Sequence, residues 1–177
     1  LRNLSAPALE SFFDVLDELV HADARVSVFE FTLQKLLIHS LRLGRAPSAA
    51  GAQIHSFTAV AGEIAVVLSA FASHSSSPID DARAAFARGA ASLQVLETPL
   101  AFRPMADGDF APLDVALDRL ARTSFAIRQR VLNAATQVAG EDGRMGVAEF
   151  ELLRAFAAAL DCPLPPLPAE PANVLSS

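Results

Sequence analysis

The sequence has no tryptophan, no tyrosine and one cysteine, Cys162, among its 177 residues. A lone cysteine cannot close an intramolecular disulfide, so the chain is not a disulfide-stabilised scaffold. Basic residues are also few, because 14 Lys and Arg stand against 20 Asp and Glu, which gives a net charge of −6. Nucleic-acid binding needs a basic surface that neutralises phosphates. We therefore expect no nucleic-acid partner.

Apolar residues and alanine dominate the remaining composition. Hydrophobic residues make up 52% of the chain, which is ample for a core, and 12 Phe supply all the aromatic bulk. Alanine, the strongest helix former, is abundant. No segment alternates apolar and polar residues in the manner of a half-buried strand. The sequence therefore predicts a single all-α domain.

Helical spacing of the apolar residues predicts one bundle of about seven helices. Ser27 and Glu30 form an S-x-x-E capping box at the start of one of them. We expect the helical domain to cover residues 1–162 and the Pro-rich residues 163–177 to form a tail that cannot propagate a helix. The predicted helices span roughly residues 6–22, 27–43, 52–74, 78–96, 112–122, 124–139 and 146–160.

The run from Phe57 to Ser73 is nearly all apolar, so a membrane span has to be weighed against a buried helix. The run holds 17 residues and includes Glu63. A span needs about 20 apolar residues, and a carboxylate at mid-depth is costly. We therefore expect a central helix of the bundle, packed on several sides, and no membrane insertion by this chain.

Two segments near the ends of the chain resemble each other. HADARVSVFEFTLQKLL covers residues 21–37, GEDGRMGVAEFELLRAF covers residues 140–156, and the two agree at six of seventeen positions. Each segment straddles the turn between two predicted helices, so we expect two similar helix–turn–helix hairpins. The apolar residues that match are Val28 with Val147, Phe31 with Phe150 and Leu33 with Leu152.

The repeated carboxylates admit two interpretations. In each copy an Asp ends one predicted helix and a Glu lies in the first turn of the next. Convergence of the two hairpins would create a site for Mg²⁺ or Ca²⁺, which prefer carboxylate oxygens. Local structure also accounts for every one of these residues, because Asp stabilises tight turns and Glu completes a capping box. The candidate metal ligands are Asp23, Glu30, Asp142 and Glu149.

The second copy resembles a known turn signature. Residues 142–149, D-G-R-M-G-V-A-E, are similar to the D-G-x-I/V-x-x-x-E pattern of TerB-like domains, the helical fold first named for tellurite resistance. Residues 23–30 resemble the same pattern, with Ala24 in place of the Gly. Gly146 stands where a capping Ser or Thr is expected. The resemblance implies a helical fold with divalent-cation binding by the four carboxylates named above.

A second resemblance covers more of the chain. The segments ADARVSVFEFTLQKLL, LDVALDRLA, RVLNAATQVAGEDGR and AEFELLRAFAAALDCPLPPL are similar to the C-terminal region of bacterial integral-membrane zinc metallopeptidases related to HtpX and the CAAX prenyl protease. The chain begins with Leu1 and shows no signal peptide, so we expect it to be a piece of a longer protein. The resemblance implies that the parent is an inner-membrane zinc peptidase.

The same resemblance implies the role of this chain. It would be a non-catalytic, soluble, cytoplasmic C-terminal domain that regulates the peptidase or binds a protein partner, the parent's own peptidase domain included. The zinc ion would belong to the upstream peptidase domain, because no H-E-x-x-H occurs here and none of the histidines has a His or Glu at that spacing. The chain's histidines are His21, His39, His55 and His74. Cys162 has no neighbouring His, so we expect no catalytic residue in this chain.

Overall fold

The computed structural model describes residues 11, 28, 30–32, 34, 54–75, 78–93, 98–105, 109–139 and 145–164. Within these ranges the chain is helical, without a β-strand, and one isolated parallel bridge joins Ile54 to Thr123. The all-α prediction is therefore confirmed. Of the predicted helix over residues 6–22, only Ser11 is described, and it is helical. Residues 165–177 of the predicted tail lie outside the described part.

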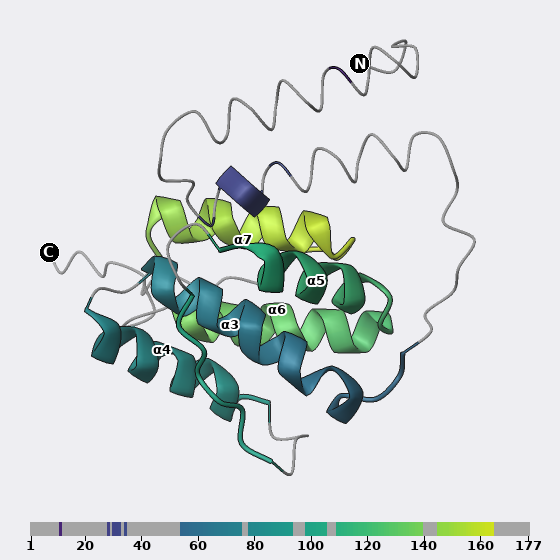
Figure 1. Ribbon diagram of the computed structural model, residues 1–177, viewed down its shortest axis with the longest axis horizontal. Coiled ribbons are helices and arrows are strands. Elements are labelled where there is room, and N and C mark those ends of the chain that lie inside the picture. Colours follow the sequence, from purple (N-terminus) through teal and green to yellow (C-terminus); the bar gives the residue numbers. More distant parts are fainter. Residues whose placement is uncertain are drawn as a thin grey trace, which may run out of the picture.

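Five of the predicted helices lie in the described part of the chain (Figure 1). The observed bounds of α5, α6 and α7 agree with the predicted ones to within one residue at each end. The start of α3 and the end of α4 differ from the prediction. The elements are η1, a 3₁₀ turn over Thr58–Val60, then α3 Ala61–Ser75, α4 Ile79–Ala91, α5 Ala111–Ala121, α6 Phe125–Ala139 and α7 Val147–Ala159.

The predicted start of the helix over residues 52–74 is wrong because long-range backbone bonds hold Ile54 in an extended conformation. The Ile54 N–H donates to the Arg122 carbonyl at 3.3 Å, and the Ser124 N–H donates to the Ile54 carbonyl at 2.9 Å. These partners lie in the turn between α5 and α6. Helical structure therefore begins only at η1, after Phe57.

Helix α4 ends at Ala91, five residues before the predicted end at Leu96. The Ser92 hydroxyl donates to the Gly89 carbonyl at 2.6 Å, and the Leu93 N–H donates to the Ala90 carbonyl at 3.0 Å. These bonds span three residues rather than four, which tightens the last turn and satisfies carbonyl groups that a helix end leaves unpaired.

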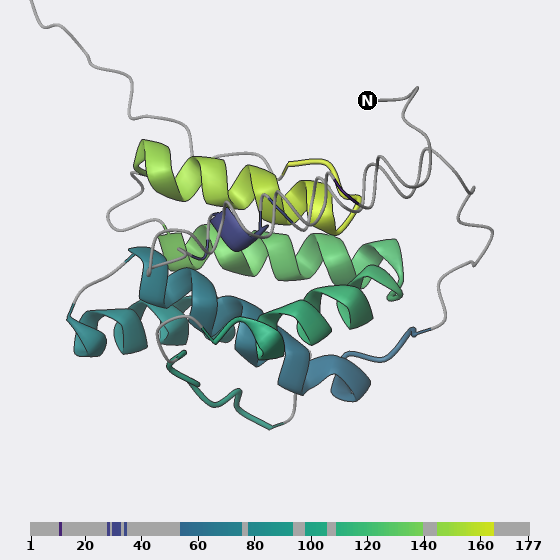
Figure 2. The same ribbon diagram turned by 45° about the horizontal axis from the view of Figure 1, so that its top comes forward.

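Helix α3 is the centre of the bundle and packs against α4, α5, α6 and α7 (Figures 1 and 2). Ile64, Leu68 and Phe71 on this helix are fully buried. The Phe71 ring meets the Phe156 ring of α7 with centroids 5.6 Å apart. The predicted central buried helix is therefore confirmed. None of the helices within the described ranges has the length and apolarity needed to cross a bilayer.

The carboxylate of Glu63 on this apolar helix is paired with α5. Arg119 Nη1 lies 2.9 Å from Glu63 Oε1, and the Glu63 side chain is only 17% exposed. Arg119 Nη2 also donates to the Ala59 carbonyl at 2.9 Å. One guanidinium thus joins α5 to both η1 and the first turn of α3, and satisfies the single acidic side chain of α3.

Helices α4 and α6 approach closely where Gly89 faces α6. A Cβ on Gly89 would lie 2.8 Å from the Ala134 carbonyl oxygen and would overlap the Val138 side chain. Gly89 is buried. The contact therefore requires the absence of a side chain and fixes the position of α4 on the bundle.

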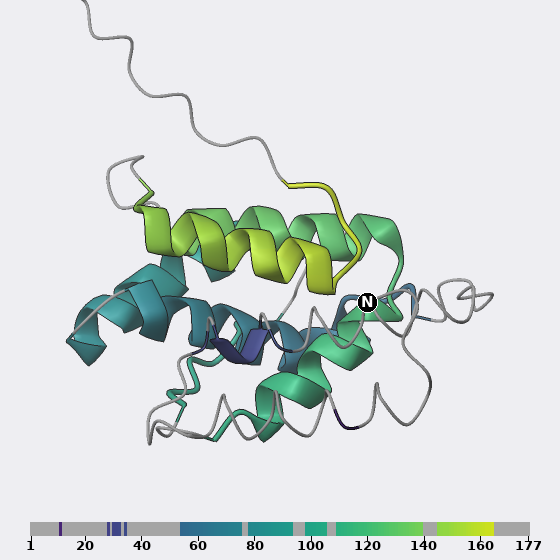
Figure 3. The same ribbon diagram turned by 90° about the horizontal axis from the view of Figure 1, so that it is seen from above.

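Helix α7 lies alongside α6 and ends in a Schellman motif (Figure 3). Asp161 adopts a positive φ of 48°. Its N–H donates to the Ala158 carbonyl at 3.2 Å, and the Cys162 N–H donates to the Ala157 carbonyl at 2.9 Å. Arg128 of α6 supports this end, because its Nη1 donates to the Leu160 carbonyl at 2.5 Å.

Of the matched apolar pairs, Phe31 and Phe150 are both half-buried, whereas Val28 and Val147 differ in burial. Val28 is half-buried and packs against the core, whereas its counterpart Val147 is 82% exposed because it is the first residue of α7. Thr32 is fully buried, whereas its counterpart Glu151 is half-exposed. Most of the two turns lies outside the described residues, so the similarity of the hairpins stays a prediction.

Candidate functional site

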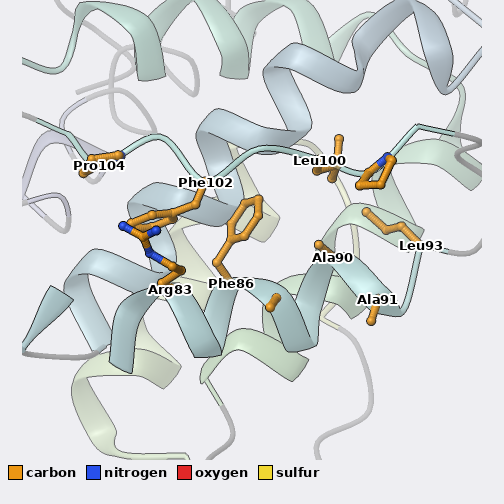
Figure 4. Close-up of a pocket in the computed structure, with 10 residues that line it drawn as sticks. Arg83, Phe86, Ala90, Ala91, Leu93, Leu100, Phe102 and Pro104 are labelled. Carbon is orange, nitrogen blue, oxygen red and sulfur yellow. The ribbon is translucent and has the colours of Figure 1, made fainter. Parts of the chain in front are cut away.

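An open cavity of about 620 Å³, here called the α4 groove, lies between α4 and the segment over residues 98–104 (Figure 4). The α4 wall includes Arg83, Phe86 and Ala90, and the wall formed by the segment includes Leu100 and Phe102. Nine of the ten lining residues are Ala, Leu, Phe or Pro, and the tenth is Arg83.

The α4 wall follows from the spacing of its residues. Positions 83, 86, 87 and 90 recur every three or four residues, so they share one face of the helix. Phe86 is buried, but Ala87 and Ala91 are small and exposed. The groove is hollow here because the short side chains of Ala87 and Ala91 leave space next to the larger Phe86.

Prolines shape the opposite wall. Pro99 and Pro104 lack an N–H and restrict the residue before each of them to an extended conformation. The segment is also fixed to α3, because the Arg103 N–H donates to Ser69 Oγ at 2.9 Å. Phe102 then packs on Phe86, with ring centroids 5.5 Å apart and an interplanar angle of 57°.

Arg83 is the one charged residue of the groove lining. Its guanidinium carbon lies 6.0 Å from the centroid of the Phe102 ring, and the two side chains occupy one end of the groove while Leu93 lies at the other (Figure 4). Arg83 makes no ion pair with any residue that the structure describes. The site can therefore receive an apolar group together with a hydrogen-bond acceptor of negative charge.

Two of the four predicted metal ligands lie in the described ranges. Glu30 is helical and exposed, and Glu149 is half-buried in the first turn of α7. Asp23 and Asp142 lie outside those ranges. Among the residues that are described, no group of three or more His, Cys, Asp or Glu is placed to hold a metal ion. Convergence of the four carboxylates therefore stays a prediction.

Glu149 has a local role in the structure. Its carboxylate folds back over Gly146, the N-cap of α7, so closely that a Cβ on Gly146 would overlap it. The Glu of a capping box lies in this position and accepts a hydrogen bond from the N-cap N–H, but no such bond joins the described residues Gly146 and Glu149. Burial lowers the pKa of His74 in the last turn of α3, and the negative charge of Glu149 partly offsets that shift. The geometry thus favours the local interpretation of this carboxylate.

Cys162 lies in the Schellman motif and is half-buried. Burial raises the pKa of its thiol, and the nearby Arg128 guanidinium opposes that shift. A raised pKa reduces the thiolate fraction, and the thiolate is the reactive form. Cys162 is therefore a half-buried residue at a helix end.

The groove residues were not found as a site from the sequence. The available signal was the pair of prolines that bracket Phe102 in the longest irregular stretch, opposite a helix face made of alanines. Comparisons with protein-family models, with curated proteins and with solved structures find no match. The TerB-like and metallopeptidase resemblances therefore rest on the quoted motifs alone.

Proposed function

We propose that this chain is a non-catalytic protein-interaction domain that binds its partner in the α4 groove. The groove itself carries this proposal: it is apolar, it is open on one side, and its volume of about 620 Å³ is within the range of binding pockets, roughly 300–1,000 Å³. Binding pockets are typically hollows lined mainly by apolar side chains with a few polar groups, and this groove has that composition.

The walls are fixed before any partner arrives. Gly89 holds α4 against α6, and Ser69 holds the opposite segment against α3. Binding to a preformed groove loses less conformational freedom than binding to a surface that has to be ordered first. A short apolar segment of a partner fits such a groove in the way that helices and extended peptides fill hydrophobic grooves elsewhere.

We place this domain, as part of the same proposal, at the cytoplasmic C-terminus of a membrane-bound zinc metallopeptidase, where it recruits a partner or controls the peptidase. The resemblance of the helical segments and of the ending LDCPLPPL supports this context. Sequencing the coding region upstream of Leu1 tests it. Apolar spans of about 20 residues and an H-E-x-x-H helix are expected there, and their absence would exclude the peptidase.

A matched pair of variants tests the groove. Ala87→Trp fills it, whereas Ala84→Trp places the same side chain on an exposed part of α4 that does not line it. A phage-displayed library of random 12-residue peptides is selected on the wild-type chain. Peptides that bind the wild type and the Ala84 variant but not the Ala87 variant are expected. If no selected peptide distinguishes the two variants, the groove is not the binding surface.

A further inference from the structure

We infer that the α4 groove selects partner segments that carry a carboxylate beside their apolar residues, and that Arg83 is the residue that binds this carboxylate. The inference rests on the proposed function and specifies the chemistry of the partner. It depends on the polar groups that the groove can offer, on their position and on the length of the groove.

Arg83 supplies the only side-chain hydrogen-bond donors of the lining. The other lining residues are Ala, Leu, Phe and Pro, whose side chains neither donate nor accept hydrogen bonds. An apolar wall attracts apolar groups without regard to direction. Discrimination between apolar partners therefore falls to Arg83, and a guanidinium recognises planar anions such as carboxylates best.

The Arg83 guanidinium lies next to the aromatic pair of the groove. It lies over the Phe102 ring, and Phe102 is itself packed on Phe86. The distance of 6.0 Å from the guanidinium carbon to the ring centroid is at the outer limit of a cation–π contact, so the N–H groups of this exposed side chain stay available to a partner. Arg83 and Phe102 lie together at one end of the groove (Figure 4). A carboxylate bound by the Arg83 guanidinium therefore lies at that end.

The acidic residues of α4 are Asp80 and Asp81 in its first turn. Both are exposed and neither lines the groove. Their position at a helix N-terminus places them where the helix dipole favours negative charge. Arg83 is therefore the charged side chain that contacts a bound segment. Asp80 and Asp81 would favour a basic residue of that segment at the edge of the groove.

The size of the groove limits the occupant to a short segment. Arg83 and Ala91 are eight residues apart on α4, which corresponds to about 12 Å at 1.5 Å per residue. This length accommodates about four residues of extended chain or about two turns of helix. The expected occupant therefore has apolar side chains over this length and one Asp or Glu at the end that meets Arg83.

The test uses the selected peptide that binds the wild-type chain most tightly, synthesised with acetylated and amidated ends. Each acidic residue of the peptide is replaced by its amide, and affinities for the wild type, Arg83→Gln and Arg83→Lys are measured by fluorescence anisotropy. One replacement is expected to weaken peptide binding to the wild type about tenfold and to leave peptide binding to Arg83→Gln nearly unchanged. Arg83→Lys should retain part of the difference, because it keeps the charge but loses the planar fork.

The outcomes separate this inference from the proposed function. If a peptide is excluded by Ala87→Trp but its acidic replacements act equally on the wild type and Arg83→Gln, the groove binds peptides and Arg83 does not select them. Selection of uniformly basic peptides would overturn the inference in the same way. If no peptide distinguishes Ala87→Trp from Ala84→Trp, both proposals fail. Melting followed by circular dichroism establishes that Arg83→Gln, a change at an exposed residue, leaves the fold intact.

Discussion

The backbone N–H of Arg103 donates a hydrogen bond of 2.9 Å to the hydroxyl of Ser69. Ser69 is fully buried in the most apolar of the helices that the structure describes, so this hydroxyl provides a polar anchor inside the core. The bond attaches an otherwise irregular segment, which forms one wall of the α4 groove, to α3.

Ser69→Ala should lower the free energy of unfolding by about 1–3 kcal/mol, because it leaves the Arg103 N–H without its acceptor. Ser73→Ala on the same helix is the matched control, since Ser73 is exposed, and should change stability by less than about 0.5 kcal/mol. Chemical denaturation followed by circular dichroism measures both. Equal effects of the two substitutions would show that the hydroxyl does not anchor the segment.

Gly89→Ala should destabilise the protein by about 1–3 kcal/mol, because the added methyl group is forced against the α6 backbone and Val138. Helix propensity alone would predict the opposite sign, a gain of about 1 kcal/mol. Gly62→Ala on α3 supplies that comparison, since a Cβ there meets nothing within 4 Å. A stabilising Gly89→Ala would show that α4 and α6 are not in close contact.

Acidification should destabilise the protein through His74. Burial lowers the pKa of His74 below its usual 6.5, so the unfolded chain binds the proton more readily than the folded one. The contribution of this group is complete above pH 6.5 and is lost as the pH falls from there to the folded pKa. The difference in unfolding free energy between the wild type and His74→Gln should therefore shrink from pH 7.5 to pH 5.

The carboxylate of Glu149 provides the internal check on this behaviour. It partly offsets the effect of burial on His74, so Glu149→Gln should lower the His74 pKa further and extend the loss of stability to lower pH. NMR titration of the His74 ring reports the pKa directly. A difference between wild type and His74→Gln that does not vary with pH would contradict this account.

Asp161→Gly should stabilise the protein by roughly 0.5–1 kcal/mol, because Asp161 holds a positive φ of 48° that glycine adopts without strain. Asp161→Ala has neither the freedom of glycine nor a polar side chain and should be the least stable of the three. Thermal unfolding ranks them. An alanine variant as stable as the glycine variant would show that the backbone conformation costs little.

The cation-binding hypothesis predicts that Mg²⁺ or Ca²⁺ raises the melting temperature. Binding to the native state stabilises it by about 2.7 kcal/mol at a hundredfold excess over Kd. The combined change Glu30→Gln and Glu149→Gln should abolish the shift. Circular dichroism is the appropriate readout, because the chain has no Trp and no Tyr. A transition that no divalent cation moves, or a shift that survives both changes, would remove these ligands from consideration.

The helix ends that could be predicted from the sequence are those set by residues next to them in the chain. Helices α6 and α7 begin directly after a serine and a glycine, and α5 carries a proline in its first turn. These residues mark helix starts locally, and the predicted bounds hold to within one residue. The start of α3 could not be predicted, because it is set by hydrogen bonds between Ile54 and the turn around Thr123. Such distant pairing leaves no mark in the sequence near Ile54.

In the candidate site, too, features set by nearby residues could be predicted and features set by distant contacts could not. The repeated carboxylates stood out because they form a motif, yet Glu149 is placed against its own N-cap at Gly146. The α4 groove consists of an alanine-rich helix face and a proline-bracketed segment, and neither is unusual by itself. It forms where Phe102 of the segment packs on Phe86 of α4 and the Ser69 hydroxyl holds the segment to α3, and both contacts depend on tertiary packing.

The bridge pairs Ile54 with Thr123, so the part of the chain between them forms a closed loop. This loop contains α3, α4, the segment over residues 98–104 and α5. Both walls of the α4 groove, and the Ser69 hydroxyl that holds one of them to α3, therefore belong to one loop of the polypeptide. Local opening at either end of the chain leaves that loop closed. The groove is consequently expected to open and close as part of a single cooperative unit, so hydrogen exchange at the Arg103 amide reports on the integrity of the whole pocket.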